Sequence, residues 1–236
     1  VLFLYIVDRR KIMVEILSRI QFAFSVGFHF LFVPLSIGLI FLVCIYEFQH
    51  LRTKNAKFKH LSEFYGDMFI INYAFGIVTG FTMSLQFGTN WSAYSLFMGD
   101  VFGTPLVIEA IVAFFLESTF TGLWIFKRNK MPGWMRFMTV SLIFIGTMFS
   151  ALWIITANGF MQNPVGYELA ADGSKILVTD FVAILFNPYA WYILIHNNTS
   201  AILLGAYFVL GIGAERYQRV DKDSDEAETF RMGFKP

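Results

Sequence analysis

The stretch FMTVSLIFIGTMFSALWIITANGF, residues 137–160, decides the fold class of this chain. It lies within 31 consecutive residues, between Arg136 and Glu168, that contain no Asp, Glu, Lys or Arg. A helix needs about 20 apolar residues to cross the hydrocarbon core of a bilayer, and this stretch is longer than that. The run is continuous and does not alternate every second residue, so it predicts a membrane helix and not a strand of a membrane barrel.

Four further stretches have the same character. Charged residues are absent from the 27 residues after Arg19, the 32 after Asp67 and the 34 after Asp180, and the 26 after Asp100 contain only two glutamates. The sequence therefore predicts an all-α integral membrane protein with five transmembrane helices, at about residues 21–48, 66–87, 103–126, 134–159 and 191–214. The composition agrees, since 15% of the residues are charged against about 25% in typical soluble domains.

The composition also excludes several classes of protein. The net charge of +1 offers no basic surface, so we expect no nucleic-acid partner. Cys44 is the one cysteine, which excludes an internal disulfide and a cysteine-ligated zinc or iron–sulfur site.

The basic residues predict the orientation. Four Lys or Arg follow the first predicted helix, four follow the third and five follow the fifth. The connection after the second predicted helix has no Lys or Arg, and the connection after the fourth has Lys175 alone. The positive-inside rule assigns the richer side to the cytoplasm, which leaves the N-terminus outside.

Two histidines lie inside the predicted helices. His29 is about two turns from the outer end of the first helix, and His196 is about one turn from the outer end of the fifth. A neutral imidazole is a good axial ligand for haem iron. Spacing alone leaves the alternative open that each histidine makes an interhelical hydrogen bond or is solvated near the interface.

Two glutamates lie inside the third predicted helix. Glu109 and Glu117 are eight residues apart, which in a regular α-helix is about 80° around the axis and about 12 Å along it. Charged groups in a membrane are costly and normally serve a function, so the pair is a candidate proton relay. The alternative is that both carboxyl groups only form hydrogen bonds to neighbouring helices.

Several local strings are similar to those of cytochrome bd quinol oxidase subunit I. They occur in the expected order in all five predicted helices, from Met13 to about Tyr217. They are SRIQFAF (18–24), FHFLFVP (28–34), GIVTG (76–80), QFGTNWS (86–92), GDVFGTPLVIE (99–109), FFLEST (114–119), SALWIITANGFMQNP (150–164) and NP (187–188) with the following His196.

This resemblance implies a membrane oxidase that takes electrons from quinol and reduces oxygen to water with a low-spin haem b, a high-spin haem b and a haem d. It implies that His29 ligates one high-spin haem and that His196 ligates the low-spin b haem. It assigns Glu109 and Glu117 to proton delivery from the cytoplasm and Arg19 to a haem propionate contact. The implied partners are an oxidase subunit II, small accessory subunits, membrane quinol and oxygen, and the implied location is the bacterial cytoplasmic (inner) membrane.

The resemblance also suggests a division of the chain. We expect residues 1–12 to be an extension upstream of the family's usual start, which Met13 resembles. Residues 13–217 form the haem-binding bundle, and residues 218–236 form a charged cytoplasmic segment that leads into a truncated sixth helix. The chain is thus expected to be the N-terminal part of the subunit, inactive by itself.

Two other functions are alternatives. A b-type cytochrome without oxygen chemistry would usually carry two histidines on each of two helices, whereas here each helix has one. A proton-coupled transporter using Glu109 and Glu117 would contain no haem and would show internal symmetry, which the sequence lacks.

Overall fold

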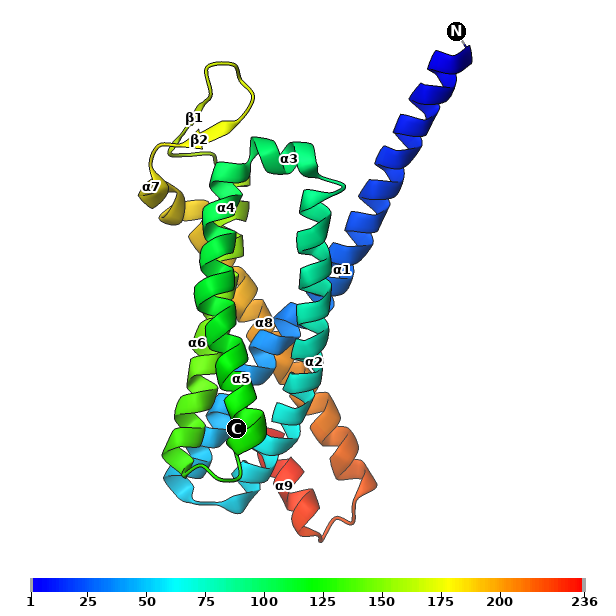
Figure 1. The fold of residues 1–236 in the computed structure, drawn as a ribbon. Helices are drawn as coiled ribbons and strands as arrows, with labels where there is room; N and C mark the ends of the chain where they lie inside the picture. Colours follow the sequence, from blue (N-terminus) through cyan, green and yellow to red (C-terminus); the bar gives the residue numbers. More distant parts are fainter. Residues whose placement is uncertain (1, 235–236) are drawn as a thin grey trace.

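The computed structural model describes the backbone of residues 2–234 and the side chains of residues 11–233. The long elements are helices, and a small hairpin lies at one end of the molecule (Figure 1). The elements are α1 (Leu2–Thr53), α2 (Ala56–Gly88), α3 (Ser92–Phe97), α4 (Gly99–Ile108), the π-helical turn η1 (Glu109–Phe114), α5 (Phe115–Lys127), α6 (Gly133–Gln162), β1 (Tyr167–Leu169), β2 (Ile176–Val178), α7 (Phe181–Leu185), α8 (Pro188–Arg219) and α9 (Asp225–Phe234).

Five helical segments of the described chain are long and apolar enough to cross a membrane, which confirms the predicted class and number. They are Lys11–Thr53, Ala56–Gly88, Gly99–Lys127, Gly133–Gln162 and Phe181–Arg219. The helices extend beyond the predicted limits, because helical hydrogen bonding continues into the charged residues that end each apolar stretch. From Leu2 the backbone of the expected extension belongs to α1, and the side chains of residues 1–10 lie outside the described part.

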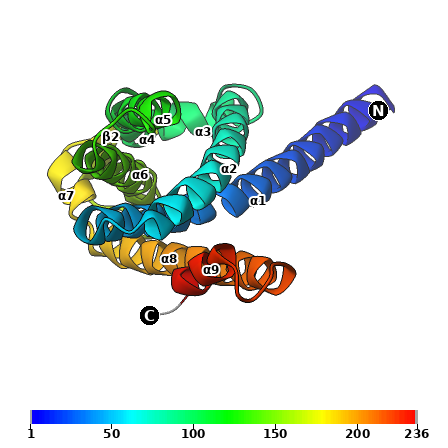
Figure 2. The ribbon, with the colours of Figure 1, turned by 90° about the horizontal axis from the view of Figure 1, so that it is seen from below.

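Helix α1 lies at the centre of the bundle. It packs against α2, α6 and α8, and the view along the bundle shows α8 on the side of α1 opposite α5 (Figure 2). α1 crosses α8 where Gly38 meets Gly205, and a Cβ atom on Gly38 would lie 2.2 Å from the Ala201 carbonyl oxygen. Glycine at both positions therefore allows the two backbones to touch.

Asparagine residues form the N-caps of two of the long helices. Asn55 precedes α2 and accepts a hydrogen bond from the backbone N–H of Lys57 at 2.9 Å. Asn187 precedes α8 and accepts one from the backbone N–H of Tyr189 at 3.1 Å. Pro188 occupies the first turn of α8, where its missing N–H costs nothing.

Strands β1 and β2 form an antiparallel hairpin at one end of the bundle. The polar residues 170–174 form its turn, and Gly173 has φ +68°, which favours glycine. The strands themselves were not predicted, because three residues each are too short to give an alternating pattern.

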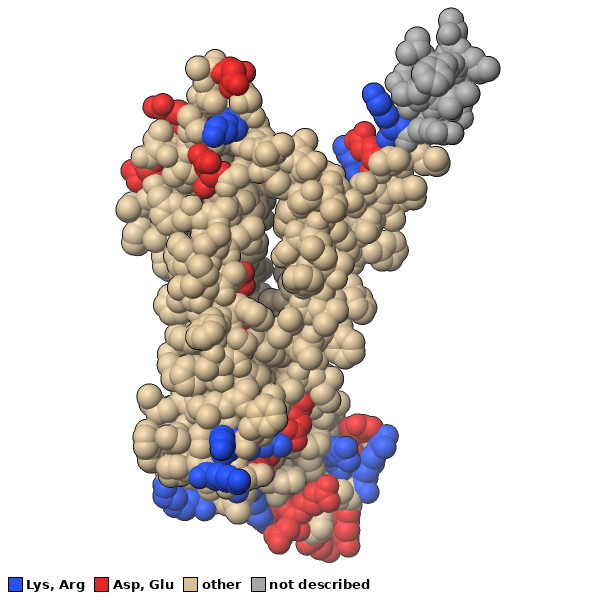
Figure 3. Space-filling view, in the orientation of Figure 1, with Lys and Arg blue, Asp and Glu red and all other residues tan. Residues whose placement is uncertain are grey.

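Charged residues gather at the two ends of the molecule, and the middle of the visible face is nearly free of them (Figure 3). We call the end with the α1–α2 and α5–α6 connections and α9 the basic end, and the end with α3 and the hairpin the hairpin end. The assignment of the basic end to the cytoplasm, with the N-terminus outside, stays a prediction. Arg136 was counted among the four basic residues that follow the third predicted helix, but it lies within α6 and is buried.

Candidate functional site

The half-buried His29 side chain of α1 faces α2. Its Nδ1 atom lies 2.9 Å from the Thr79 hydroxyl oxygen. The imidazole rests on the α2 backbone, because a Cβ atom built on Gly80 would lie 3.0 Å from its Cε1 atom. The GIVTG string at residues 76–80 thus forms the surface that receives this ring, and larger side chains at Gly80 would displace it.

His196 lies on α8 with its side chain exposed. It makes no hydrogen bond to any residue whose side chain the structure describes, so both ring nitrogens are available to a ligand outside the chain. This arrangement fits an axial ligand that faces a cofactor.

The two histidines stand at matching positions on crossing helices. Each lies nine residues before the glycine at the α1–α8 crossing, Gly38 for His29 and Gly205 for His196. Nine residues correspond to about 14 Å along a helix, so both lie on the hairpin side of the crossing, at similar depth. The structure does not bring the two imidazoles into contact, since His29 faces α2 and His196 is exposed. Among the described residues no three His, Cys, Asp or Glu side chains could hold a metal ion together.

Glu117 is buried between three helices. Only 5% of its surface is exposed, and its Oε2 atom lies 3.4 Å from the Tyr73 hydroxyl, which donates to it from α2. Its Oε1 atom is buried without a hydrogen-bond partner among the described residues. Gly146 of α6 makes room for it, because a Cβ atom there would lie 2.7 Å from the Glu117 Cγ atom.

Glu109 lies on the same side of α6 as Glu117. The Ser150 hydroxyl of α6 is close enough to interact with both carboxyl groups, and the two carboxyl groups interact electrostatically with each other. This hydroxyl is buried without a normal hydrogen bond to the described residues. The structure therefore brings together the two predicted glutamates and adds Tyr73 and Ser150.

The backbone between the glutamates is not a regular α-helix. Residues 109–114 form a π-helical turn that begins at Glu109, so the 80° separation expected for a regular helix does not apply. Such turns are wider than α-helical turns and are frequent at functional sites. The sequence carries no periodic signal for a single inserted residue, so this feature could not be predicted.

Arg19 lies in the exposed part of α1 and pairs with Glu15 at 2.6 Å. No other described side chain binds it. The contact of Arg19 with a haem propionate stays a prediction.

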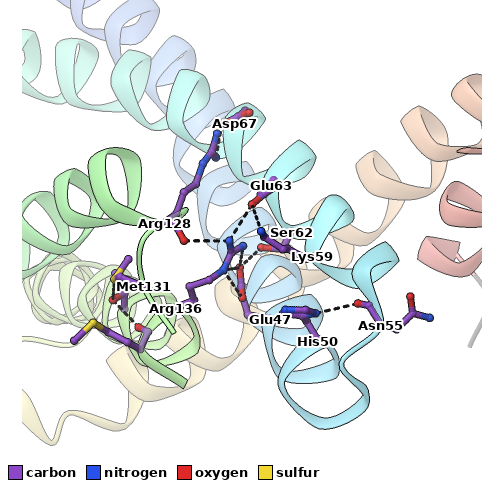
Figure 4. Close-up of polar contacts among 12 residues, drawn as sticks. Glu47, His50, Asn55, Lys59, Ser62, Glu63, Asp67, Arg128, Met131 and Arg136 are labelled. Atoms are coloured by element: carbon purple, nitrogen blue, oxygen red, sulfur yellow. Dashed lines mark hydrogen bonds and ion pairs between the residues drawn. The ribbon is translucent and has the colours of Figure 1, made fainter. Parts of the chain in front are cut away.

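A second cluster of charges lies inside the basic end and was not predicted (Figure 4). Arg136 binds Glu47 of α1 and Glu63 of α2, and Ser62 also donates a hydrogen bond to Glu47. Arg128 pairs nearby with Asp67 at 2.6 Å. Sequence inspection missed the cluster because each member lies at the end of an apolar stretch, where a charge is usually solvated.

Comparison with known proteins identifies the family of this chain. Residues 17–235 match the family described as cytochrome bd terminal oxidase subunit I. The chain is 44% identical over 220 residues to cytochrome bd ubiquinol oxidase subunit 1 of Bacillus subtilis (strain 168). It is 43% identical over 217 residues to cytochrome bd-II ubiquinol oxidase subunit 1 of Escherichia coli (strain K12).

The similar regions cover most of this chain and part of each relative. They span 93% and 92% of this chain but 46% and 42% of the two relatives, so the chain spans less than half of their length. A chain from the structure of bd oxidase from Geobacillus thermodenitrificans has the same fold, with a TM-score of 0.85 and 23% identity over 93% of this chain and 50% of that chain. The chain described here has five apolar helices and is a multi-pass membrane protein. It belongs to the cytochrome bd terminal oxidase subunit I family.

Proposed function

We propose that this chain is the haem-binding part of a terminal oxidase subunit that oxidises membrane quinol and reduces oxygen to water. The observation that carries the proposal is the family match over residues 17–235. The two relatives are named as ubiquinol oxidases, which favours this function over a simple electron carrier or a transporter. Because the chain spans less than half the length of these relatives, the activity, the substrates and the partners are all part of the proposal.

His29 is proposed as the axial ligand of a high-spin haem and His196 as a ligand of the low-spin b haem. A ligating histidine normally donates one ring N–H to a protein acceptor and binds metal through the other nitrogen. His29 meets the first condition through its contact with Thr79, and the exposed His196 has both nitrogens available. When bound, the proposed set of two b-type haems and one d-type haem would carry electrons from quinol to oxygen.

Glu117 and Glu109 are proposed to hold the protons that oxygen reduction consumes. Glu117 lies nearer the basic end, because it is closer along the helix to Lys127. The buried Ser150 hydroxyl lies near both carboxyl groups and has no hydrogen-bond partner among the described residues, and a hydroxyl can accept a proton from one side while donating its own to the other. The Tyr73 hydroxyl donates to Glu117 and holds its carboxyl group in place. A proton would thus pass from Glu117 through Ser150 to Glu109, away from the basic end.

The direction of this path fits the proposed orientation. If the basic end faces the cytoplasm, protons for water enter from the cytoplasm, while quinol releases its protons on the outer side. The positive-inside rule supports that assignment. The oxidase would then separate charge across the bacterial cytoplasmic membrane, in a complex with a subunit II and small accessory subunits, with Arg19 near a haem propionate.

The test uses the full-length subunit assembled with its partners in membranes. His29→Ala should remove one high-spin haem band from the reduced-minus-oxidised spectrum and abolish quinol-dependent oxygen uptake. His60→Ala, an exposed histidine at the basic end, is the matched control and should leave both unchanged. An intact haem spectrum in assembled His29→Ala complex would contradict the assignment.

A further inference from the structure

We infer that Thr79 is a positioning residue for His29, because its hydroxyl oxygen accepts a hydrogen bond from Nδ1–H and thereby leaves Nε2 as the metal-binding nitrogen. The inference rests on the proposed function, in which His29 ligates haem iron. It concerns a contact within this chain, between α1 and α2, and its failure can be distinguished from a failure of that function.

The Thr79 hydroxyl has one proton, and the α2 backbone takes it. The oxygen lies 2.8 Å from the carbonyl oxygen of Phe75 and 3.0 Å from that of Gly76. A carbonyl oxygen can only accept, so the hydroxyl proton must point toward these two groups. Only a lone pair of the hydroxyl oxygen remains to face His29.

The imidazole must therefore be the donor in its contact with Thr79. Nδ1 lies 2.9 Å from the hydroxyl oxygen, a normal length for a hydrogen bond. This acceptor favours the neutral tautomer with its proton on Nδ1.

This tautomer leaves Nε2 with a free lone pair. Among the described side chains and backbone groups, none forms a hydrogen bond with Nε2. A hydrogen bond from the second ring nitrogen fixes the tautomer and ring orientation of a metal-ligating histidine and raises its basicity. Thr79 is placed to do this for His29, and the absence of a Cβ atom on Gly80 lets the ring come close enough.

The experiment measures the iron–histidine stretching vibration by resonance Raman spectroscopy on the reduced, fully assembled oxidase. Thr79→Val keeps the branched shape and removes the acceptor, so the band should move to lower frequency. Haem transfer to apomyoglobin should become about tenfold faster or more, as expected when such a partner is lost. Thr79→Ser restores a hydroxyl and should return both values close to those of the unmodified oxidase.

Thr82→Val is the matched control. Thr82 lies one turn away on α2, is exposed, and donates to the Val78 carbonyl at 2.9 Å without contacting His29. The Thr82→Val variant loses the same kind of hydrogen bond from a hydroxyl to the backbone. Its iron–histidine vibration and its haem transfer rate should therefore stay unchanged. If Thr79→Val does not assemble, Thr79→Ala provides the same comparison.

The outcomes separate the two proposals. If His29→Ala keeps every haem band, His29 is not a ligand and the proposed function of this residue fails. If His29→Ala loses its band but Thr79→Val leaves the vibration and the transfer rate unchanged, the positioning role alone is overturned. Equal shifts in Thr79→Val and Thr79→Ser would also overturn it, because serine retains the acceptor.

Discussion

Arg136 of α6 and Glu47 of α1 form an ion pair that is almost completely buried. The Nη2 and Oε1 atoms are 2.5 Å apart, and the side chains are 3% and 0% exposed. The arginine Nε atom also donates to both carboxylate oxygens, at 3.1 and 3.2 Å. Glu63 of α2 binds the Arg136 Nη1 atom at 2.9 Å, so one guanidinium joins three helices.

Removal of either partner should strongly destabilise the protein. Arg136→Met would leave the Glu47 carboxylate buried without its countercharge, and Glu47→Gln would leave the guanidinium with Glu63 as its one carboxylate partner. Such a loss typically lowers the free energy of unfolding by about 3–5 kcal/mol. The measurement is thermal unfolding of the detergent-solubilised complex.

Two controls distinguish an unpaired charge from a simple packing defect. Arg219→Ala breaks an exposed pair with Glu215 and should change the free energy of unfolding by about 1 kcal/mol at most. The double variant Glu47→Met with Arg136→Met should recover most of the stability, because Glu63 retains Lys59 at 3.8 Å. A double variant as unstable as the worse single variant would refute this explanation.

Glu117→Gln should block proton delivery and leave the haems in place. The amide keeps the shape of the side chain but cannot release a proton to Ser150, so quinol-dependent oxygen uptake should fall by about 100-fold or more. The reduced-minus-oxidised haem spectrum, recorded on the same membranes, should be unchanged. Glu168→Gln, in the exposed strand β1, is the control and should retain full oxygen uptake.

Tyr73→Phe tests how Glu117 is held. The ring should stay in place, since it stacks on Phe69 with centroids 5.4 Å apart. The lost hydrogen bond is long, at 3.4 Å, so we expect a fall in oxygen uptake of less than about tenfold. A loss equal to that of Glu117→Gln would instead make the tyrosine hydroxyl part of the proton path.

The helices could be predicted from the sequence, and their contacts could not. The length of an apolar stretch depends only on local composition, so five membrane helices follow from the positions of Asp, Glu, Lys and Arg. The proximity of Ser150 to Glu117, or of Thr79 to His29, depends on which helix faces lie together. One sequence carries little information on that point, because Ser and Thr are common in membrane helices for packing alone.

The burial of Arg136 shows the same limit for charged residues. An arginine three residues inside a helix, next to a basic loop, usually extends its charge into water. Here Glu47 and Glu63 come from the ends of α1 and α2 and surround it. The sequence predicts the ends of these helices but not that the three ends meet.

Gly38→Ala should disrupt the crossing of α1 and α8. The added Cβ atom would lie 2.2 Å from the Ala201 carbonyl oxygen and 2.8 Å from the Gly205 Cα atom, and backbone atoms cannot rotate away. The helices must separate, with an expected loss of about 1–3 kcal/mol or more in the free energy of unfolding. Gly27→Ala on the same helix meets nothing within 4 Å and should be neutral or up to about 1 kcal/mol stabilising. Equal thermal stability of the two variants would contradict a tight crossing.

Asn187→Ala should cost more stability than the loss of an ordinary helix cap. Asn187 caps α8 through its Oδ1 atom, and its Nδ2 atom donates to the carbonyl oxygens of Gly159 and Asn163 at 3.2 and 2.8 Å. The side chain thus connects the start of α8 to the end of α6. Alanine would leave the carbonyl oxygen and the Nδ2 atom of Asn163 without these partners, whereas the Gly159 carbonyl oxygen keeps its hydrogen bond from the Asn163 N–H at 2.9 Å. Asn55→Ala removes only a cap and should lower the free energy of unfolding by about 1 kcal/mol. We expect Asn187→Ala to exceed that by a further 1–3 kcal/mol or so, since buried groups then lack hydrogen bonds. Thermal unfolding of the two variants side by side makes the comparison, and equal losses would show that the α6–α8 connection contributes little.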